Sequence, residues 1–237
     1  MNMLRKNNSD IFLRRKRAFV NAASKLIQTQ PFDSISIRKI AEEAGFHNST
    51  IYSYFQDADW LLALASVGHL QPYSDDLLII NNQDLSPYDH FYTIWNCFCR
   101  HAFSNPALYY NFFFGKYKYH LTELIEEYYS LFPDMKNEHS PRINAMFLGS
   151  NMQDRCLSIL QPLADDPKTR LTENNLSWAN FIIVSTLEEY LANQIRGADE
   201  FIPETDDDHE LIYRDIQEDF RKPTAEFLEM LHFIVDR

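Results

Sequence analysis

Apolar residues recur at helical spacing along most of the chain, and this pattern predicts an all-α protein. Near the N-terminus the positions i, i+3, i+4 and i+7 of one short helix are Ile37, Ile40, Ala41 and Ala44. Ser36 precedes this helix, where its hydroxyl can accept from a free backbone N–H of the first turn. Gly45 follows it, where a left-handed residue commonly ends a helix.

A second short helix is predicted over residues 48–55, with Ile51 and Phe55 turned inward. Two short helices joined by a tight glycine turn form a helix-turn-helix. The remaining side chains of the second helix are polar or aromatic and point outward; they are Asn48, Ser49, Thr50, Tyr52 and Tyr54. Such a face suits the major groove of DNA better than a protein core.

The same periodicity predicts further helices at residues 10–28, 57–65, 86–103, 107–131, 141–160, 172–196, 209–221 and 223–235. Asp57 is a predicted N-cap, and Gly197 is a predicted helix end. Residues 1–9 are interpreted as a flexible basic arm, and the acidic run Glu204–Asp208 as a solvated loop.

The N-terminal stretch resembles the DNA-binding domain of the TetR/AcrR transcriptional regulators over roughly residues 12–65. The residues that match this family in order and spacing are Ala22, Ala23, Phe32, Ile37, Ile40-Ala41, Ala44-Gly45-Phe46 and Thr50-Ile51-Tyr52-Ser53-Tyr54-Phe55. Two departures stand out. Pro31 occupies the place where the family usually has a glycine, and the run Gln56–Asp59 lacks the lysine that usually binds a phosphate.

The resemblance implies a helix-turn-helix DNA-binding domain of three helices at residues 1–60 and a larger helical effector-binding and dimerisation domain at residues 61–237. It also implies a repressor that binds double-stranded DNA at a palindromic operator as a homodimer. The residues expected to contact DNA are Arg14, Arg15, Arg38, Lys39, Asn48, Ser49, Thr50, Tyr52 and Tyr54.

The distribution of charge agrees with a DNA-binding head on an acidic body. The whole chain carries −12, which argues against nucleic-acid binding until it is divided by region. Residues 1–55 hold nine lysines and arginines against four acids, a net of +5, so the rest of the chain carries −17. A basic segment that coincides with a helix-turn-helix is typical of DNA-binding domains.

Apolar residues on more than one face of the 172–196 helix indicate a surface that needs covering. The 223–235 helix offers a matching stripe, and in the family two such helices from each subunit form the dimer interface. The residues predicted to lie in that interface are Ile183, Leu187, Phe227 and Leu231.

Aromatic residues are unusually dense between Tyr88 and Tyr129, which indicates either a wide core or a cavity for an apolar or aromatic effector. The candidate lining residues are Trp95, Phe98, His101, Phe112, Phe113 and Tyr117. Two alternatives remain open. The acidic body can instead bind a protein partner, or the chain can be a helical protein with a vestigial head.

Enzymatic and metal chemistry find little support. Cys97 and His101 are at i, i+4 on one helix face and can share a metal, but the sequence names no third ligand. We expect no metal and no cofactor, and motifs of hydrolases and nucleotide-binding enzymes are absent. Glu126–Glu127 and Glu188–Glu189 are interpreted as solvated helix faces.

The compartment is inferred from cysteine content and from the N-terminus. Three cysteines without framework spacing are typical of a reducing cytosol. The N-terminus lacks a hydrophobic signal core, and no window approaches the roughly 20 apolar residues of a membrane span. We expect a cytoplasmic protein without a membrane partner.

Overall fold

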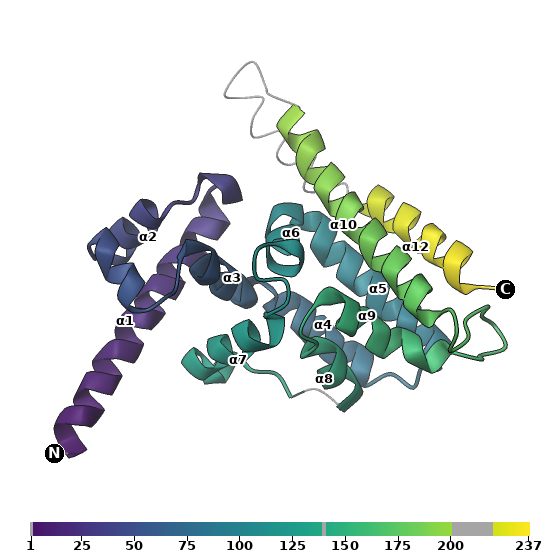
Figure 1. Ribbon diagram of the computed structural model, residues 1–237, viewed down its shortest axis with the longest axis horizontal. Coiled ribbons are helices and arrows are strands. Elements are labelled where there is room, and N and C mark those ends of the chain that lie inside the picture. The colour runs from purple at the N-terminus through teal and green to yellow at the C-terminus, as the bar shows by residue number, and fades with distance from the viewer. Residues whose placement is uncertain (1, 139–140, 201–219) are drawn as a thin grey trace. The chain divides into compact units, whose positions relative to one another are not determined.

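The computed structural model describes residues 2–138, 141–200 and 220–237, and every named element in these ranges is a helix (Figure 1). The predicted all-α fold is therefore confirmed. The α-helices are α1 (Asn2–Thr29), α2 (Ile37–Ala44), α3 (Ala58–His69), α4 (Gln71–Asn81), α5 (Pro87–Ser104), α6 (Pro106–Phe114), α7 (Leu121–Leu131), α8 (Pro141–Phe147), α9 (Met152–Leu160), α10 (Leu176–Glu200) and α12 (Arg221–Val235). Short 3-10 helices are η1 (Phe32–Ser34), η2 (Asn48–Ser53), η3 (Pro133–Met135) and η4 (Gln161–Leu163).

Several predicted boundaries were wrong. The helix predicted over residues 107–131 is broken into α6 and α7 at Gly115, where a side chain would collide with the carbonyl oxygen of Asn111. The helix predicted over 141–160 is likewise broken between α8 and α9. Residues 2–9 belong to α1 rather than to an arm, and α10 continues through Gly197 to Glu200.

No helix was predicted over residues 71–81, where the structure has α4. Pro72 lies in the first turn of α4, where a missing N–H costs nothing. The acidic run Glu204–Asp208 and nearly all of the predicted 209–221 helix lie outside the described residues.

The chain divides into two compact units. The first comprises Met1–Gln71 and His120–Lys136, so α7 clusters with the N-terminal helices although it is distant in sequence. The second comprises Pro72–Tyr119 and Asn137–Arg237. The sequence-based boundary at residue 60 stays a prediction.

Glu127 of α7 links this helix to α1 and α3 within the first unit. Its Oε1 lies 2.7 Å from Lys16 Nζ of α1, and its Oε2 accepts a 3.0 Å hydrogen bond from Trp60 Nε1 of α3. Arg17 Nε donates to the carbonyl oxygen of Leu131 at 2.6 Å. The interpretation of Glu127 as a solvated residue was therefore wrong, because α7 packs against α1 and α3 and turns this carboxylate toward them.

The second unit has an aromatic core centred on α5. Trp95 and Phe98 are almost wholly buried, and their rings meet at 5.8 Å. Phe98 also contacts Tyr73 of α4 and Phe113 of α6, with ring centroids 5.5 Å and 5.2 Å apart. Edge-on contacts of this kind add to the free energy of burying the rings.

Helices α10 and α12 pack against each other and run in opposite directions along the second unit (Figure 1). Their predicted interface residues face inward: Ile183, Leu187, Phe227 and Leu231 are 0% exposed in the single chain. These side chains are part of the core of the unit and leave no surface for a second chain, so their assignment to the interface needs correction. The exposed apolar residues are instead Trp178, Phe181 and Ile182 of α10 and Phe233 of α12.

In the described part of the chain, the helices are too short or too polar for any of them to cross a membrane.

Candidate DNA-binding surface and effector cavity

The turn between α2 and η2 has the local structure that its sequence dictates. Ser36 Oγ accepts from the backbone N–H of Lys39 at 3.3 Å and caps α2. Gly45 has φ 74°, a left-handed conformation that glycine adopts without steric cost. The N–H of Phe46 then donates to the carbonyl of Ala41 at 2.9 Å, which closes the end of the helix.

The second helix of the motif differs from the prediction. It is the 3-10 helix η2, which ends at Ser53 rather than at Phe55. His47 precedes it, and its Nδ1 accepts from the N–H of Ser49 at 3.4 Å. His47 is the N-cap of this helix, and the side chain of Asn48 makes no capping contact.

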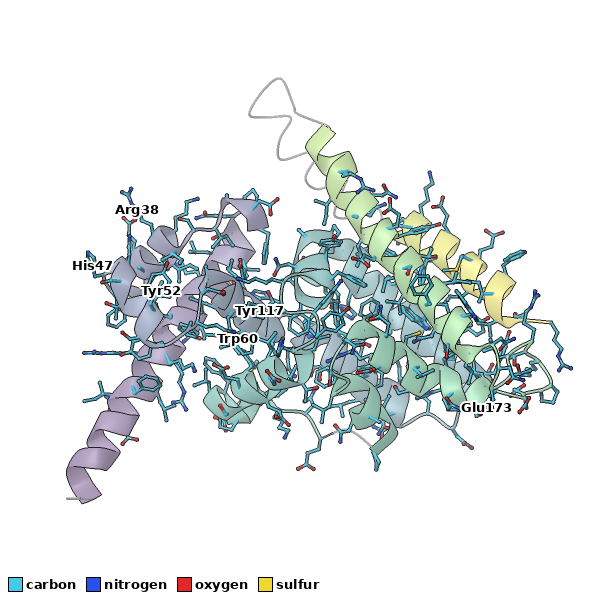
Figure 2. The ribbon with its side chains drawn as sticks, viewed as in Figure 1. Arg38, His47, Tyr52, Trp60, Tyr117 and Glu173 are labelled. Atoms are coloured by element: carbon cyan, nitrogen blue, oxygen red, sulfur yellow. The ribbon has the colours of Figure 1, made fainter. Side chains whose placement is uncertain are left out.

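Several predicted DNA-contacting residues form an outward surface on the first unit. Arg38, Asn48, Ser49 and Tyr52 are exposed, and Tyr52 is 59% exposed. Arg38 and His47 extend away from the helices in Figure 2. Ile51, in the middle of the same helix, is fully buried. Helix η2 is thus anchored by one apolar residue and presents its polar residues to the solvent.

Two other predicted residues already have partners within the unit. Lys39 Nζ donates to Gln30 Oε1 at 2.8 Å and to the carbonyl of Ser34 at 2.9 Å. The ring of Tyr54 is half-buried, with its centroid 4.7 Å from that of Phe12 in α1. Lys39 is exposed but hydrogen-bonded on the surface of the unit, whereas the ring of Tyr54 packs against α1.

The basic run at residues 14–17 is divided by the structure into two pairs. Lys16 and Arg17 contact Glu127 and Leu131, as described above, and hold α7. Arg14 and Arg15 are exposed, and the guanidinium of Arg15 lies 5.9 Å from the ring centroid of Phe46. A helix places consecutive residues on different faces, so only half of this run remains available to an external anion.

A small cavity of about 20 Å³ lies in the second unit. Its walls come from α4, α5, α8 and α9, and its lining residues are Tyr73, Ile94, Trp95, Phe98, Met146, Met152, Arg155, Cys156 and Ile159. Trp95 and Phe98 were predicted from the aromatic pattern. Arg155 was missed, since a single arginine in an amphipathic segment carries no sequence signal of burial.

The other predicted effector residues lie around this cavity or elsewhere in the unit. Phe113 is stacked under the guanidinium of Arg155, and Phe112 contacts Phe113 with ring centroids 4.9 Å apart. Tyr117 is half-buried, and Lys116 Nζ lies 5.3 Å from its ring centroid. His101 is engaged by a carboxylate.

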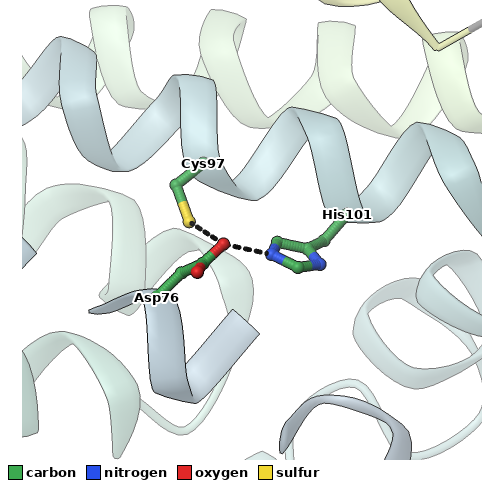
Figure 3. Close-up of side chains that lie close together, drawn as sticks. All are labelled: Asp76, Cys97 and His101. Atoms are coloured by element: carbon green, nitrogen blue, oxygen red, sulfur yellow. Dashed lines mark hydrogen bonds and ion pairs between the residues drawn. The ribbon is translucent and has the colours of Figure 1, made fainter. Parts of the chain in front are cut away.

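That carboxylate is Asp76 of α4, which meets Cys97 and His101 of α5 (Figure 3). His101 Nε2 lies 2.8 Å from Asp76 Oδ2, and Cys97 Sγ lies 3.9 Å from the same oxygen. Asp76 is the third donor that the sequence could not name. Burial, and then the charge of Asp76, raises the pKa of the Cys97 thiol to about 12, so the thiol is protonated at neutral pH. The three side chains can share a metal ion by spacing, but the pairing of His101 with Asp76 accounts equally well for their positions.

The first unit thus has the local structure of a helix-turn-helix, the motif of many DNA-binding domains. Residues 19–64 match the model of the bacterial regulatory proteins of the tetR family. This match agrees with the resemblance found in the sequence and supports a DNA-binding transcriptional regulator of this type.

No curated protein sequence matches the chain. Several solved structures are similar over most of its length. A putative tetR family transcription regulator from Shewanella sp. PV-4 is 12% identical, with 94% of this chain and 98% of that chain covered and a TM-score of 0.48. The fatty acid degradation regulator FadR from Bacillus halodurans is 14% identical, with coverages of 94% and 97% and a TM-score of 0.46. A TetR transcriptional regulator from Rhodococcus sp. RHA1 is 16% identical, with coverages of 91% and 96% and a TM-score of 0.43.

Proposed function

We propose that this regulator is a repressor that binds a palindromic operator as a homodimer and leaves it when a small, largely apolar or aromatic effector binds in the second unit. The observation that carries the DNA-binding part is the outward surface of α2 and η2. Arg38, Asn48 and Tyr52 are exposed there, and none has a side-chain partner among the described residues. Arginine and asparagine are the side chains that pair with guanine and adenine edges in the major groove.

Arg14 and Arg15 extend this surface along α1 and supply contacts to phosphates. Contacts to phosphates position a protein on the duplex, whereas contacts to base edges select the sequence. Lys39 is hydrogen-bonded to Gln30 and Ser34, and Ser49 Oγ lies 2.9 Å from His47 Nδ1. The residues proposed to contact bases are therefore Arg38, Asn48 and Thr50. Tyr52 is proposed to contact the DNA backbone, and Tyr54 to hold α1 in place through its contact with Phe12.

The experiment compares operator affinities of single variants on a duplex selected from a random pool. Asn48→Ala and Arg38→Ala are each expected to weaken specific binding by about 1–3 kcal/mol, the cost of losing one base contact. Asn96→Ala is the matched control, because Asn96 is an exposed asparagine on α5 in the second unit. An Asn48→Ala variant that binds like the control would show that η2 does not read the bases.

Arg14→Ala is expected to behave differently from the base-reading variants. Loss of one phosphate contact weakens specific and non-specific binding alike. It also makes the slope of the logarithm of affinity against the logarithm of salt concentration less negative by about 1. Titrations at several salt concentrations measure this slope. An unchanged slope with reduced affinity would instead point to a base contact or to damage of α1.

The homodimer is proposed to form through the exposed side chains of α10 and α12. Trp178 and Phe181 are 70% and 57% exposed, and Phe233 is 78% exposed. Because α10 and α12 run in opposite directions (Figure 1), Trp178 near the start of one and Phe233 near the end of the other belong to the same end of the pair. Exposed apolar patches of this kind commonly mark interaction sites. A two-fold dimer presents two recognition elements and thereby matches a palindromic operator.

A further inference from the structure

Arg155 is a buried charge in an otherwise uncharged cavity wall. Its side chain is 3% exposed, and the other lining residues are aromatic, aliphatic, thiol or thioether side chains. Burial lowers the pKa of the guanidinium to about 10, which leaves it protonated at neutral pH. A positive charge therefore lies directly behind the apolar wall of the cavity.

The contacts of this guanidinium are incomplete. Its Nε donates to the carbonyl of Gly149 at 3.1 Å, and its plane lies over two rings, with the central carbon 5.4 Å from the ring centroid of Phe113 and 5.6 Å from that of Phe147. Its Nη2 is buried and has no acceptor in the described part of the chain, and no carboxylate there pairs with it. Stacking on aromatic faces offsets part of the cost of desolvation but does not satisfy an N–H.

A second residue of the cavity lining also has an unpaired donor: Trp95 Nε1 is buried without an acceptor among the described residues. Both donor atoms lie behind the apolar surface of the cavity, and an acceptor reaches them only if the surrounding side chains move. Buried N–H groups in native proteins are nearly always paired, so two unpaired donors beside one cavity favour an acceptor that enters from outside. An acceptor with negative charge suits this cavity best, because it also neutralises the guanidinium. A carboxylate matches the planar fork of arginine with two parallel hydrogen bonds.

The turn at Gly149 and the first turn of α9 fix the position of the Arg155 side chain. Arg155 is the fourth residue of α9, and its own backbone and Cγ lie against Gly149 in the preceding turn. A Cβ at residue 149 would approach Arg155 Cγ to 2.8 Å, so the glycine leaves room for the arginine stem. The helix and the turn together direct a charged side chain inward, where an apolar residue of similar length would be cheaper to bury.

The remaining walls describe the rest of the ligand. They are apolar and aromatic, and a volume of about 20 Å³ holds little more than one water molecule. Met146 and Met152 form part of the wall, and methionine side chains repack easily around different shapes. A larger apolar body can therefore enter by displacing these two side chains.

We propose that the effector of this regulator is an organic acid with an apolar body, and that Arg155 binds its carboxylate. The inference rests on the proposed effector function and specifies its chemical class. In the absence of ligand, the positive charge of Arg155 has no negative partner. The carboxylate of the ligand supplies that partner, and the resulting ion pair favours the ligand-bound form over the empty form.

The test compares acids with alcohols of the same shape. Octanoate, decanoate and 3-phenylpropionate are paired with 1-octanol, 1-decanol and 3-phenyl-1-propanol, and binding to the full chain is measured by calorimetry and by the shift in melting temperature. A ligand that binds only the folded form must raise the melting temperature. We expect at least one acid to bind at least tenfold more tightly than its alcohol. Equal binding of acid and alcohol, or no binding of any acid, would overturn the inference.

Variants of Arg155 separate binding from packing. Arg155→Met should abolish the preference for the acid and, without ligand, melt at or above the temperature of the wild type, because it removes an uncompensated buried charge. Arg155→Lys keeps the charge but loses the fork, and should retain a weakened preference. Arg100→Met is the control, since Arg100 is exposed on α5 and does not line the cavity. If Arg155→Met fails to fold, the wild-type comparison and Arg155→Lys still decide.

Release from DNA is measured separately, by fluorescence anisotropy of the operator duplex with and without the acid. An acid that binds through Arg155 but leaves operator affinity unchanged supports the ligand assignment and refutes the proposed release. Equal binding of acid and alcohol, together with release by both, supports the effector function and refutes the role of Arg155. A markedly lower melting temperature of Arg155→Met with no acid preference in the wild type would make Arg155 a packing residue.

Discussion

Replacing Gly68 with alanine tests the packing of α3 on α7 in the first unit. A Cβ on Gly68 would lie 2.5 Å from Tyr128 Oη and 3.2 Å from Tyr128 Cζ. Tyr128 is buried, so its ring cannot swing into solvent. Forcing an extra methyl into a filled site costs about 1–3 kcal/mol. Alanine is favoured over glycine by about 1 kcal/mol in a helix interior and by less in a last turn such as that of Gly68, which leaves a net loss of about 0–3 kcal/mol in the free energy of unfolding.

Gly197 offers the matched control, because it lies within α10 and a Cβ there would meet nothing within 4 Å. Gly197→Ala should therefore stabilise the chain by about 0.5–1 kcal/mol through helix propensity alone. The two glycine replacements should differ by about 1–3 kcal/mol, the cost of the collision at Gly68. Thermal melting followed by circular dichroism measures the difference, at roughly 2–4 °C per kcal/mol for a domain of 150–250 residues.

The variant Tyr128→Phe tests whether the hydroxyl of Tyr128 is the group that collides with the new methyl. Tyr128→Phe removes the hydroxyl that meets the new methyl first, and Tyr128 Oη has no hydrogen bond among the described residues, so the single change should cost little. Combined with Gly68→Ala, it should recover most of the lost stability. If Gly68→Ala stabilises the protein as much as Gly197→Ala does, or if Tyr128→Phe does not rescue it, the packing argument is refuted.

Three other predictions follow from contacts in the two units. Phe181→Glu should convert the dimer to monomers in analytical ultracentrifugation and abolish tight operator binding, because it places a charge on the exposed face of α10; a dimer that survives would place the interface elsewhere. Glu127→Gln should lower the free energy of unfolding by about 1–3 kcal/mol, because it removes the ion pair with Lys16. The control is Glu126→Gln at the exposed neighbouring position, which should stay within about 0.5 kcal/mol of the wild type; denaturant titrations measure both variants. Burial acts to raise the pKa of Asp236, but hydrogen bonds from His232, Tyr92 and Tyr88 outweigh it and leave that pKa below its ordinary value. The carboxylate therefore stabilises the fold above about pH 4 and loses this effect as the pH falls through its lowered pKa. The melting temperatures of the wild type and of Asp236→Asn should differ at pH 5 and converge in stronger acid. A difference in melting temperature that persists unchanged in acid would exclude the charge of Asp236 as its cause.

Local chemistry in the sequence determined the elements of the first unit. Ser36, Gly45 and Asp57 cap or end their helices as predicted, because capping depends on a side chain and a backbone only a few residues apart. The buried positions of Ile40 and Ile51 follow from helical spacing in the same way. The family resemblance of residues 12–65 rests on these short-range patterns, and the matched segment 19–64 confirms it.

Helical periodicity shows which face of a helix is apolar but not what covers it. The apolar stripes of α10 and α12 were predicted, yet the tertiary structure decided that Ile183 and Leu231 fill the core while Phe181 and Phe233 face the solvent. The helix breaks at Gly115 and near Gly149 were also missed. At each glycine a Cβ would collide with a residue only four or six positions away, Asn111 or Arg155.

The polar contacts between distant segments were beyond the sequence altogether. Glu127 pairs with Lys16 across more than a hundred residues, and Asp76 meets His101 from another helix. Arg155 gave no sign in the sequence that it would be buried in an apolar cavity. A charged residue in an amphipathic segment is ordinarily solvated, and only the packing of α4, α5, α8 and α9 around this one removes it from water.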